Sequence, residues 1–160
     1  MKKALSLLLL ITLIISMCAC SQIPVSDNNS KNTKLSDFYS KVSESQALLD
    51  DVADDIYNNW HGAVYDDEFD GDIDTAILVA QMNHAEDLEK IETLDAEIAE
   101  LFKSVKDGNC SDLVKNIMSA YSDYYEFVVN VSGSFDSYSA NLETLKKELA
   151  SLLRDLSYEL

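Results

Sequence analysis

The segment 66–77 carries the residue types and the spacing of a calcium-binding loop. Its acidic residues are Asp66, Asp67, Glu68, Asp70, Asp72 and Asp74. Five of these fall on ligand positions of the EF-hand pattern, and Gly71 falls on its turn-forming position. Ile77 stands where that pattern needs a bidentate Glu, so we expect at most weak, roughly millimolar binding. The other interpretation, which the sequence favours, is a turn between helices in which Gly71 takes a positive φ and Asp72 or Asp74 caps the next helix.

The two histidines and the paired carboxylates do not form a catalytic arrangement. On helices joined by the 66–74 loop, His61 and His84 differ in axial position by roughly 12 Å, and neither has a Ser or Cys at motif spacing. His84 falls on an apolar stripe and is expected in the core, whereas His61 is expected on the surface. Adjacent carboxylates such as Asp50 and Asp51 indicate a solvated helix face. We therefore predict no catalytic residue, no metal ligand and no cofactor.

Residues 1–19 have the pattern of a secretory signal peptide. Lys2 and Lys3 supply positive charge ahead of the apolar run 4–17. That run is shorter than the roughly 20 apolar residues that span a bilayer, and it fits a secretory apolar region of roughly 7–15 residues. We therefore predict that residues 1–19 are removed on export. An uncleaved membrane anchor and ordinary secretion after cleavage elsewhere are the alternatives.

Two cysteines flank the predicted cleavage site, and Cys20 is the better lipid acceptor. Cys20 follows the small Ala19, whereas Cys18 follows the larger Met17. The segment resembles the lipobox of bacterial lipoproteins, which implies cleavage before Cys20 and attachment of a thioether-linked diacylglycerol. Two acyl chains, such as palmitate, give stable membrane anchoring. Cys110 then remains as the single free thiol, and we expect it to be half-buried beside a turn.

The exported part is strongly acidic. It keeps all 29 acidic side chains and, without Lys2 and Lys3, 10 of the 12 basic ones, which gives a formal charge of −19. Such a surface repels the phosphate backbone, so nucleic-acid binding is excluded. It attracts cations or a basic partner, although a solvated helix surface also explains it.

The exported part divides into a tether and one helical domain. Residues 20–34 contain the lipidated Cys and a polar stretch with the single proline of the chain, and we expect a flexible tether there. Residues 35–160 contain four glycines and no proline, which favours helix throughout. We therefore predict that 35–160 is one helical bundle domain.

Three apolar stripes with alternating three- and four-residue spacing run along this domain, over 35–63, 73–105 and 113–156. The third stripe crosses 132–134 without a change of phase, which predicts one continuous helix over about 111–157. The fold expected is all-α, an elongated antiparallel up-down-up three-helix bundle with a long third helix. The alternative is a four-helix bundle with a break at 132–134.

In the three-helix arrangement the end of the third helix projects beyond the second. The apolar residues on this overhang are Leu149, Leu152, Leu153 and Leu156. They would bind a protein partner, associate with a second copy of the chain, or fold back. In that last case they would be covered by Trp60, Val64, Tyr65 and Phe69. The tether would enter beside the 107–111 turn and face the membrane, while the 66–74 loop and the C-terminus would lie at the distal end.

The whole chain resembles the small helical lipoproteins of Gram-positive gut bacteria. The lipobox segment 17–20, the polar tether and the helical pattern that ends in 145–156 carry this resemblance. It implies an extracytoplasmic location on the cell membrane and brings no known activity. We therefore expect a surface-tethered, non-enzymatic protein-interaction or scaffold module. The alternative is weak divalent-cation binding or sensing through the 66–74 loop.

Overall fold

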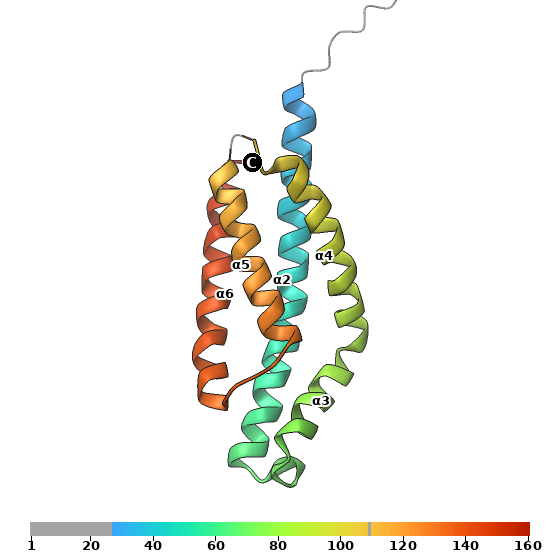
Figure 1. Cartoon of the computed structure of the whole chain (residues 1–160), viewed down its shortest axis with the longest axis vertical. Coiled ribbons are helices and arrows are strands. Elements are labelled where there is room, and N and C mark those ends of the chain that lie inside the picture. Colours follow the sequence, from blue (N-terminus) through green and yellow to red (C-terminus); the bar gives the residue numbers. More distant parts are fainter. Residues whose placement is uncertain (1–26, 109) are drawn as a thin grey trace, which may run out of the picture. The chain divides into compact units, whose positions relative to one another are not determined.

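The computed structural model describes residues 27–108 and 110–160, and within them it is built from helices (Figure 1). The elements are α2 (Asp27–Tyr65), the 3-10 helix η1 (Glu68–Gly71), α3 (Ile73–Asn83), α4 (Ala85–Val105), α5 (Ser111–Val129) and α6 (Phe135–Ser157). No strand occurs among the described residues. The all-α prediction is confirmed. The predicted signal peptide, Cys20 and the first part of the tether lie outside the described residues.

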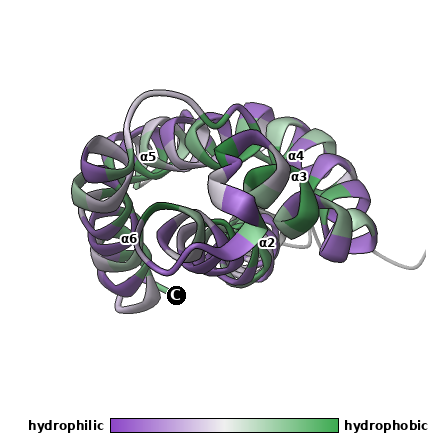
Figure 2. Ribbon diagram, turned by 90° about the horizontal axis from the view of Figure 1, so that it is seen from below, coloured by the Kyte–Doolittle hydropathy of each residue, from purple (hydrophilic) through white to green (hydrophobic). Residues whose placement is uncertain are grey.

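Residues 31–160 form one compact unit, in which helices pack around a shared core. Viewed along the helices, α2 and α5 face each other, with α6 on one side and α3 and α4 on the other (Figure 2). Hydrogen bonds and ion pairs connect α2 to its neighbours. Lys41 pairs with Glu97 of α4 at 2.8 Å, and the Tyr138 hydroxyl of α6 donates to the Ala53 carbonyl at 3.3 Å. The 31–65 part of α2 therefore forms one wall of the bundle.

The predicted apolar stripes form the core. Fully buried side chains along them include Phe38, Ile56, Ile98, Ile117 and Leu149. Burial of each such side chain contributes about 1.5–3 kcal/mol to folding. Because every helix places its stripe toward the same interior, the spacing of apolar residues correctly identified most of the core.

The predicted continuous third helix is wrong, because the chain turns between α5 and α6. Helix α5 ends at Val129 and α6 begins at Phe135. Gly133 has φ +95°, which favours glycine, and Ser134 caps α6 by accepting from the Ser137 backbone N–H at 3.3 Å. The Ser134 N–H in turn donates to the Ser137 hydroxyl oxygen at 3.0 Å, which completes a capping box. The apolar phase survives because both helices still face the same core, and phase alone does not report a turn.

This turn removes the predicted overhang. Leu149, Leu153 and Leu156 are buried, and Leu152 is half-buried against the core. The alternative cover is also wrong, because Trp60 lies against Phe135 and Tyr138 near the opposite end of α6. The C-terminus lies at the end of the unit where α4 leads into α5, not at the end of the 66–74 loop as predicted (Figure 1).

Two further boundaries differ from the predictions. Helix α2 begins at Asp27, ahead of residue 35, where the helical domain was expected to start. Extending a helix that already exists requires no new nucleation, and the stretch contains no proline. The second predicted helix is interrupted at His84, which has φ −107° and ψ 25° between α3 and α4. The His84 Nδ1 lies 2.8 Å from the Asp87 carboxylate, so a half-buried polar group stabilises this break.

Candidate functional site

The acidic loop is a turn between α2 and α3, as the favoured interpretation predicted. Gly71 has φ +76°, and Asp72 caps α3. The Asp72 carboxylate accepts from the Thr75 N–H at 3.1 Å and from the Thr75 hydroxyl at 2.9 Å, which lowers the pKa of that carboxyl. Asp67, Phe69 and Asp70 also have positive φ, a conformation that costs a non-glycine residue about 1–2 kcal/mol. The turn is therefore defined by its own hydrogen bonds and backbone.

The candidate metal ligands do not converge in the described part of the chain. No group of three His, Cys, Asp or Glu side chains there is arranged to hold a metal ion. The His61 Nδ1 lies 3.3 Å from Asp66, and His84 contacts Asp87 and Asp55 instead. The two histidines thus have separate carboxylate partners. Cation binding by the 66–74 loop stays a prediction.

The expected half-buried position of Cys110 beside a turn is confirmed. Cys110 is free and half-buried, and it packs against the core at the turn before α5. Nothing else in the described structure pairs with its sulfur.

Buried tyrosine hydroxyls bond back to α2 through the middle of the bundle. The Tyr124 hydroxyl donates to Asp50 at 2.6 Å, and the Tyr121 hydroxyl lies 3.1 Å from the buried Ser45 hydroxyl. Burial raises the pKa of Tyr121, Tyr124 and Tyr138, so all three hydroxyls keep their protons. The sequence placed these rings in the core. It did not reveal their hydrogen bonds, for which Ser45 on an apolar stripe was the available signal.

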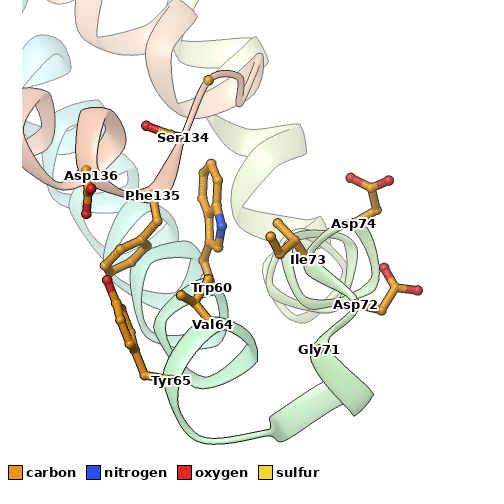
Figure 3. A pocket seen from close by; sticks show the side chains of 11 residues that line it. Trp60, Val64, Tyr65, Gly71, Asp72, Ile73, Asp74, Ser134, Phe135 and Asp136 are labelled. Carbon is orange, nitrogen blue, oxygen red and sulfur yellow. The ribbon is translucent and has the colours of Figure 1, made fainter.

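A groove opens at the end of the unit where α2 ends and where α3 and α6 begin. Its volume is about 650 Å³. Its apolar wall consists of Trp60, Val64, Tyr65, Ile73 and Phe135 (Figure 3). Its acidic rim consists of Asp72, Asp74 and Asp136. None of the lining residues is basic. Volumes of this order are typical of ligand sites.

Phe135 joins the aromatic residues on one side of this groove. Its ring centroid lies 6.1 Å from that of Trp60 and 5.6 Å from that of Tyr65, both in edge-to-face geometry. Trp60 also contacts Tyr138 at 5.4 Å, which ties the groove to the core. Edge-to-face pairs of this kind contribute about 0.5–1.5 kcal/mol each. These ring contacts connect the Trp60, Tyr65 and Phe135 side of the groove to the core.

The indole nitrogen of Trp60 has no hydrogen-bond partner. Trp60 is 3% exposed, and among the described residues its Nε1 is the one buried side-chain nitrogen or oxygen without a partner. A buried donor left without an acceptor costs about 1–3 kcal/mol. Figure 3 shows the nitrogen on the edge of the ring that faces Ile73 across the groove. The sequence placed Trp60 on the core stripe and gave no sign that its N–H would be unpaired.

Comparisons with known proteins add no assignment. No protein-family model, curated protein or solved structure matches this chain. None of the described helices combines the length and the apolar character that crossing a bilayer would require.

Proposed function

We propose that the chain is a lipid-anchored, non-enzymatic interaction module on the outer face of the cell membrane. Its anchor is the diacylglycerol that the lipobox-type segment would place on Cys20. The charge of Lys2 and Lys3, the short apolar run 4–17 and the small Ala19 support this proposal. Anchoring would keep residues 31–160 outside the cell and covalently attached to the membrane lipid.

The groove is the surface that we assign to interaction. The unit 31–160 begins within α2, and the groove lies at the other end of this helix. At 1.5 Å per residue, residue 31 and the end of α2 are about 50 Å apart. The unpaired Trp60 N–H is the observation that carries the assignment, because a partner could supply the acceptor that the chain lacks. Exposed Tyr65 beside it offers apolar contact area.

The lipid anchor is tested by labelling the full chain in a bacterium that processes lipoproteins. Cells are fed an alkyne analogue of palmitate, and the labelled protein is detected after gel electrophoresis. We expect label in the wild type and in Cys18→Ala, but none in Cys20→Ala, which should accumulate as precursor. Label that survives Cys20→Ala would refute the assignment of the acceptor, and an unlabelled wild type would refute the anchor.

The interaction role is tested by photo-crosslinking in the same cells. The photoreactive p-benzoylphenylalanine replaces either Tyr65 at the groove or Tyr158 near the C-terminus. Both side chains are well exposed, at 59% and 78%, so they form a matched pair. We expect a discrete crosslinked product from position 65 and none from position 158. Equal products from both positions would show random collision, and no product from position 65 would contradict the proposed surface.

A further inference from the structure

We propose that the groove binds a basic segment of a partner protein and holds one Arg or Lys side chain between its aromatic wall and its acidic rim. This inference rests on the proposed interaction role and names the chemistry of the partner. Three observations carry it: an exposed apolar wall, carboxylates without counter-ions, and the unpaired indole N–H.

The apolar wall suits the stem of a long basic side chain. Val64, Tyr65 and Ile73 are 40%, 59% and 37% exposed, although each is large and apolar or aromatic. Lys and Arg pack their methylene stems along such surfaces while the charged head stays near solvent. A cation over the face of an exposed aromatic ring gains about 0.5–1 kcal/mol, and Tyr65, at 59% exposed, is the ring of this wall that a ligand can reach most easily. A basic side chain can therefore place its apolar stem on this wall and its positive charge near an aromatic ring.

The rim carries negative charge that the chain itself does not neutralise. Asp74 and Asp136 lie in the first turns of α3 and α6, and neither makes an ion pair within the described structure. The positive ends of these two helices do not reverse the sign, because each carries only about half an elementary charge against three carboxylates. A formal charge of −19 on the exported chain also attracts a basic partner from a distance.

The Trp60 N–H selects a peptide among cationic ligands. A quaternary ammonium ion would meet the aromatic wall and the rim, but it has no atom that accepts a hydrogen bond. A sugar hydroxyl can accept from the indole and donate to a carboxylate of the rim, yet a neutral sugar forms no ion pair there. A peptide segment supplies both groups, since its backbone carbonyl accepts from Trp60 and its side chain carries the positive charge. A small local opening between α2 and α3 would give that carbonyl access to the buried donor.

The test uses the fact that Trp60 is the only tryptophan of the chain. Its indole gives a single ¹⁵N–¹H resonance in the full chain held in detergent micelles. The probe is acetyl-Ala-Ala-Arg-Ala-Ala-amide, and the matched control carries uncharged citrulline in place of arginine. We expect the arginine peptide to move the indole proton downfield in a saturable manner, with at least about tenfold weaker binding of the citrulline peptide.

Charge-matched variants separate the rim from general attraction. Asp74→Asn with Asp136→Asn should weaken binding of the arginine peptide by about tenfold, because the rim loses two of its three carboxylates and with them most of its attraction for the positive charge. Asp51→Asn with Asp112→Asn removes the same charge from exposed positions outside the groove and should leave affinity nearly unchanged. Equal weakening by both pairs would overturn the proposal, as would equal binding of the citrulline peptide.

A carbohydrate is the principal competing ligand. Cellotetraose and chitotetraose, two neutral oligosaccharides, are titrated in the same way. An indole shift with either sugar and none with the arginine peptide would overturn the basic-segment proposal and assign the groove to sugars. That result would leave the proposed lipid anchor intact, because the palmitate labelling tests Cys20 independently. If the wild type took up no palmitate label but its indole still shifted with the arginine peptide, the lipid anchor would be refuted and the basic-segment proposal would stand.

Discussion

Buried polar side-chain atoms are hydrogen-bonded in the middle of the bundle, whereas the one at Trp60 at the groove end is not. In the middle, Tyr121, Tyr124 and Tyr138 extend their hydroxyls toward α2, and each hydroxyl finds a partner there. At the groove end, Trp60 lies on α2 itself, and its N–H finds none. Paired polar groups in a core fix the packing of helices, whereas an unpaired donor weakens it. Internal packing and hydrogen bonds therefore account for the middle of the bundle, whereas the groove end contains a buried donor without a partner among the described residues.

Surface residues follow the same division. Lys146 lies over the middle, with its Nζ 2.6 Å from Asp54 and 3.8 Å from Asp50, so acidic side chains there are partly neutralised. At the groove end the rim carboxylates Asp74 and Asp136 lack such a cation, and Tyr65 stands exposed. The helices therefore have paired charges over the middle of the bundle and, within the described part of the chain, unpaired carboxylates at the groove end.

The largest expected difference between the two regions comes from removing one tyrosine ring from each. Tyr124→Ala should lower the free energy of unfolding by about 3–5 kcal/mol, because it deletes a fully buried ring. Tyr65→Ala should lower it by only about 0.5–1.5 kcal/mol, because that ring is mostly exposed and its removal deletes mainly the edge-to-face contact with Phe135. Urea unfolding followed by circular dichroism measures both. Comparable losses would show that the groove end is ordinary core.

A smaller loss is expected from removing one hydroxyl in the middle. Tyr121→Phe keeps the ring but leaves the buried Ser45 hydroxyl without this partner, so it should destabilise the chain by about 1–3 kcal/mol. Adding Ser45→Ala to this variant should restore part of the loss, since both unpaired groups are then absent. The same unfolding measurement tests this, and additive losses would show that the hydrogen bond has no role in stability.

The wall of the groove depends on the conformation of Gly133. Gly133→Ala should cost about 1–2 kcal/mol, because φ +95° disfavours a Cβ, and that Cβ would lie 2.9 Å from the Ser137 hydroxyl of the capping box. Gly62→Ala is the control. Gly62 lies inside helix α2, and its new Cβ would push the Glu68 carboxylate aside while the Glu68 Cβ stays in ordinary contact at 3.4 Å; because Ala favours helix over Gly, stability should change little. Thermal melting of both variants checks this contrast, and equal melting temperatures would contradict it.

A still smaller effect is expected from pH, through Asp50. Burial raises the pKa of Asp50 above its usual 3.8, although the Tyr124 hydrogen bond and Lys146 act in the opposite direction. Between 3.8 and the raised value the folded chain binds more protons than the unfolded chain, so stability falls as pH rises through this window. Asp50→Asn should therefore gain less stability than the wild type when pH falls from 7 to about 4. Parallel pH profiles in urea unfolding would contradict this assignment.

The apolar spacing predicted the helices and most of the core, because burial follows helical periodicity. It failed at 130–134, where Gly133 and the Ser134 cap turn the chain without shifting the apolar phase. It failed again at His84, since a one-residue break leaves the stripe nearly continuous. Ser132, Gly133 and Ser134 are residue types typical of a turn. The unbroken spacing of apolar residues across them nevertheless favoured a continuous helix.

The candidate site could be predicted only in part. The turn role of Gly71 and the cap at Asp72 followed from local residue types, because such interactions reach only three or four positions along the chain. The groove joins the end of α2, the start of α3 and the start of α6, and depends on the turn that the sequence did not settle. The missing partner of the Trp60 N–H is likewise a property of packing that no spacing reveals.

The most direct test of the contrast between the two regions is the hydrogen-bonding state of the Trp60 indole in the free chain. Its ¹⁵N–¹H resonance can be compared with that of free indole in a non-accepting solvent and in water. We predict that the proton resonates at the upfield position of an unbonded N–H, exchanges slowly with solvent, and moves downfield only when the arginine peptide is added. A downfield position in the free chain, with a nuclear Overhauser effect to an internal acceptor group, would contradict the account.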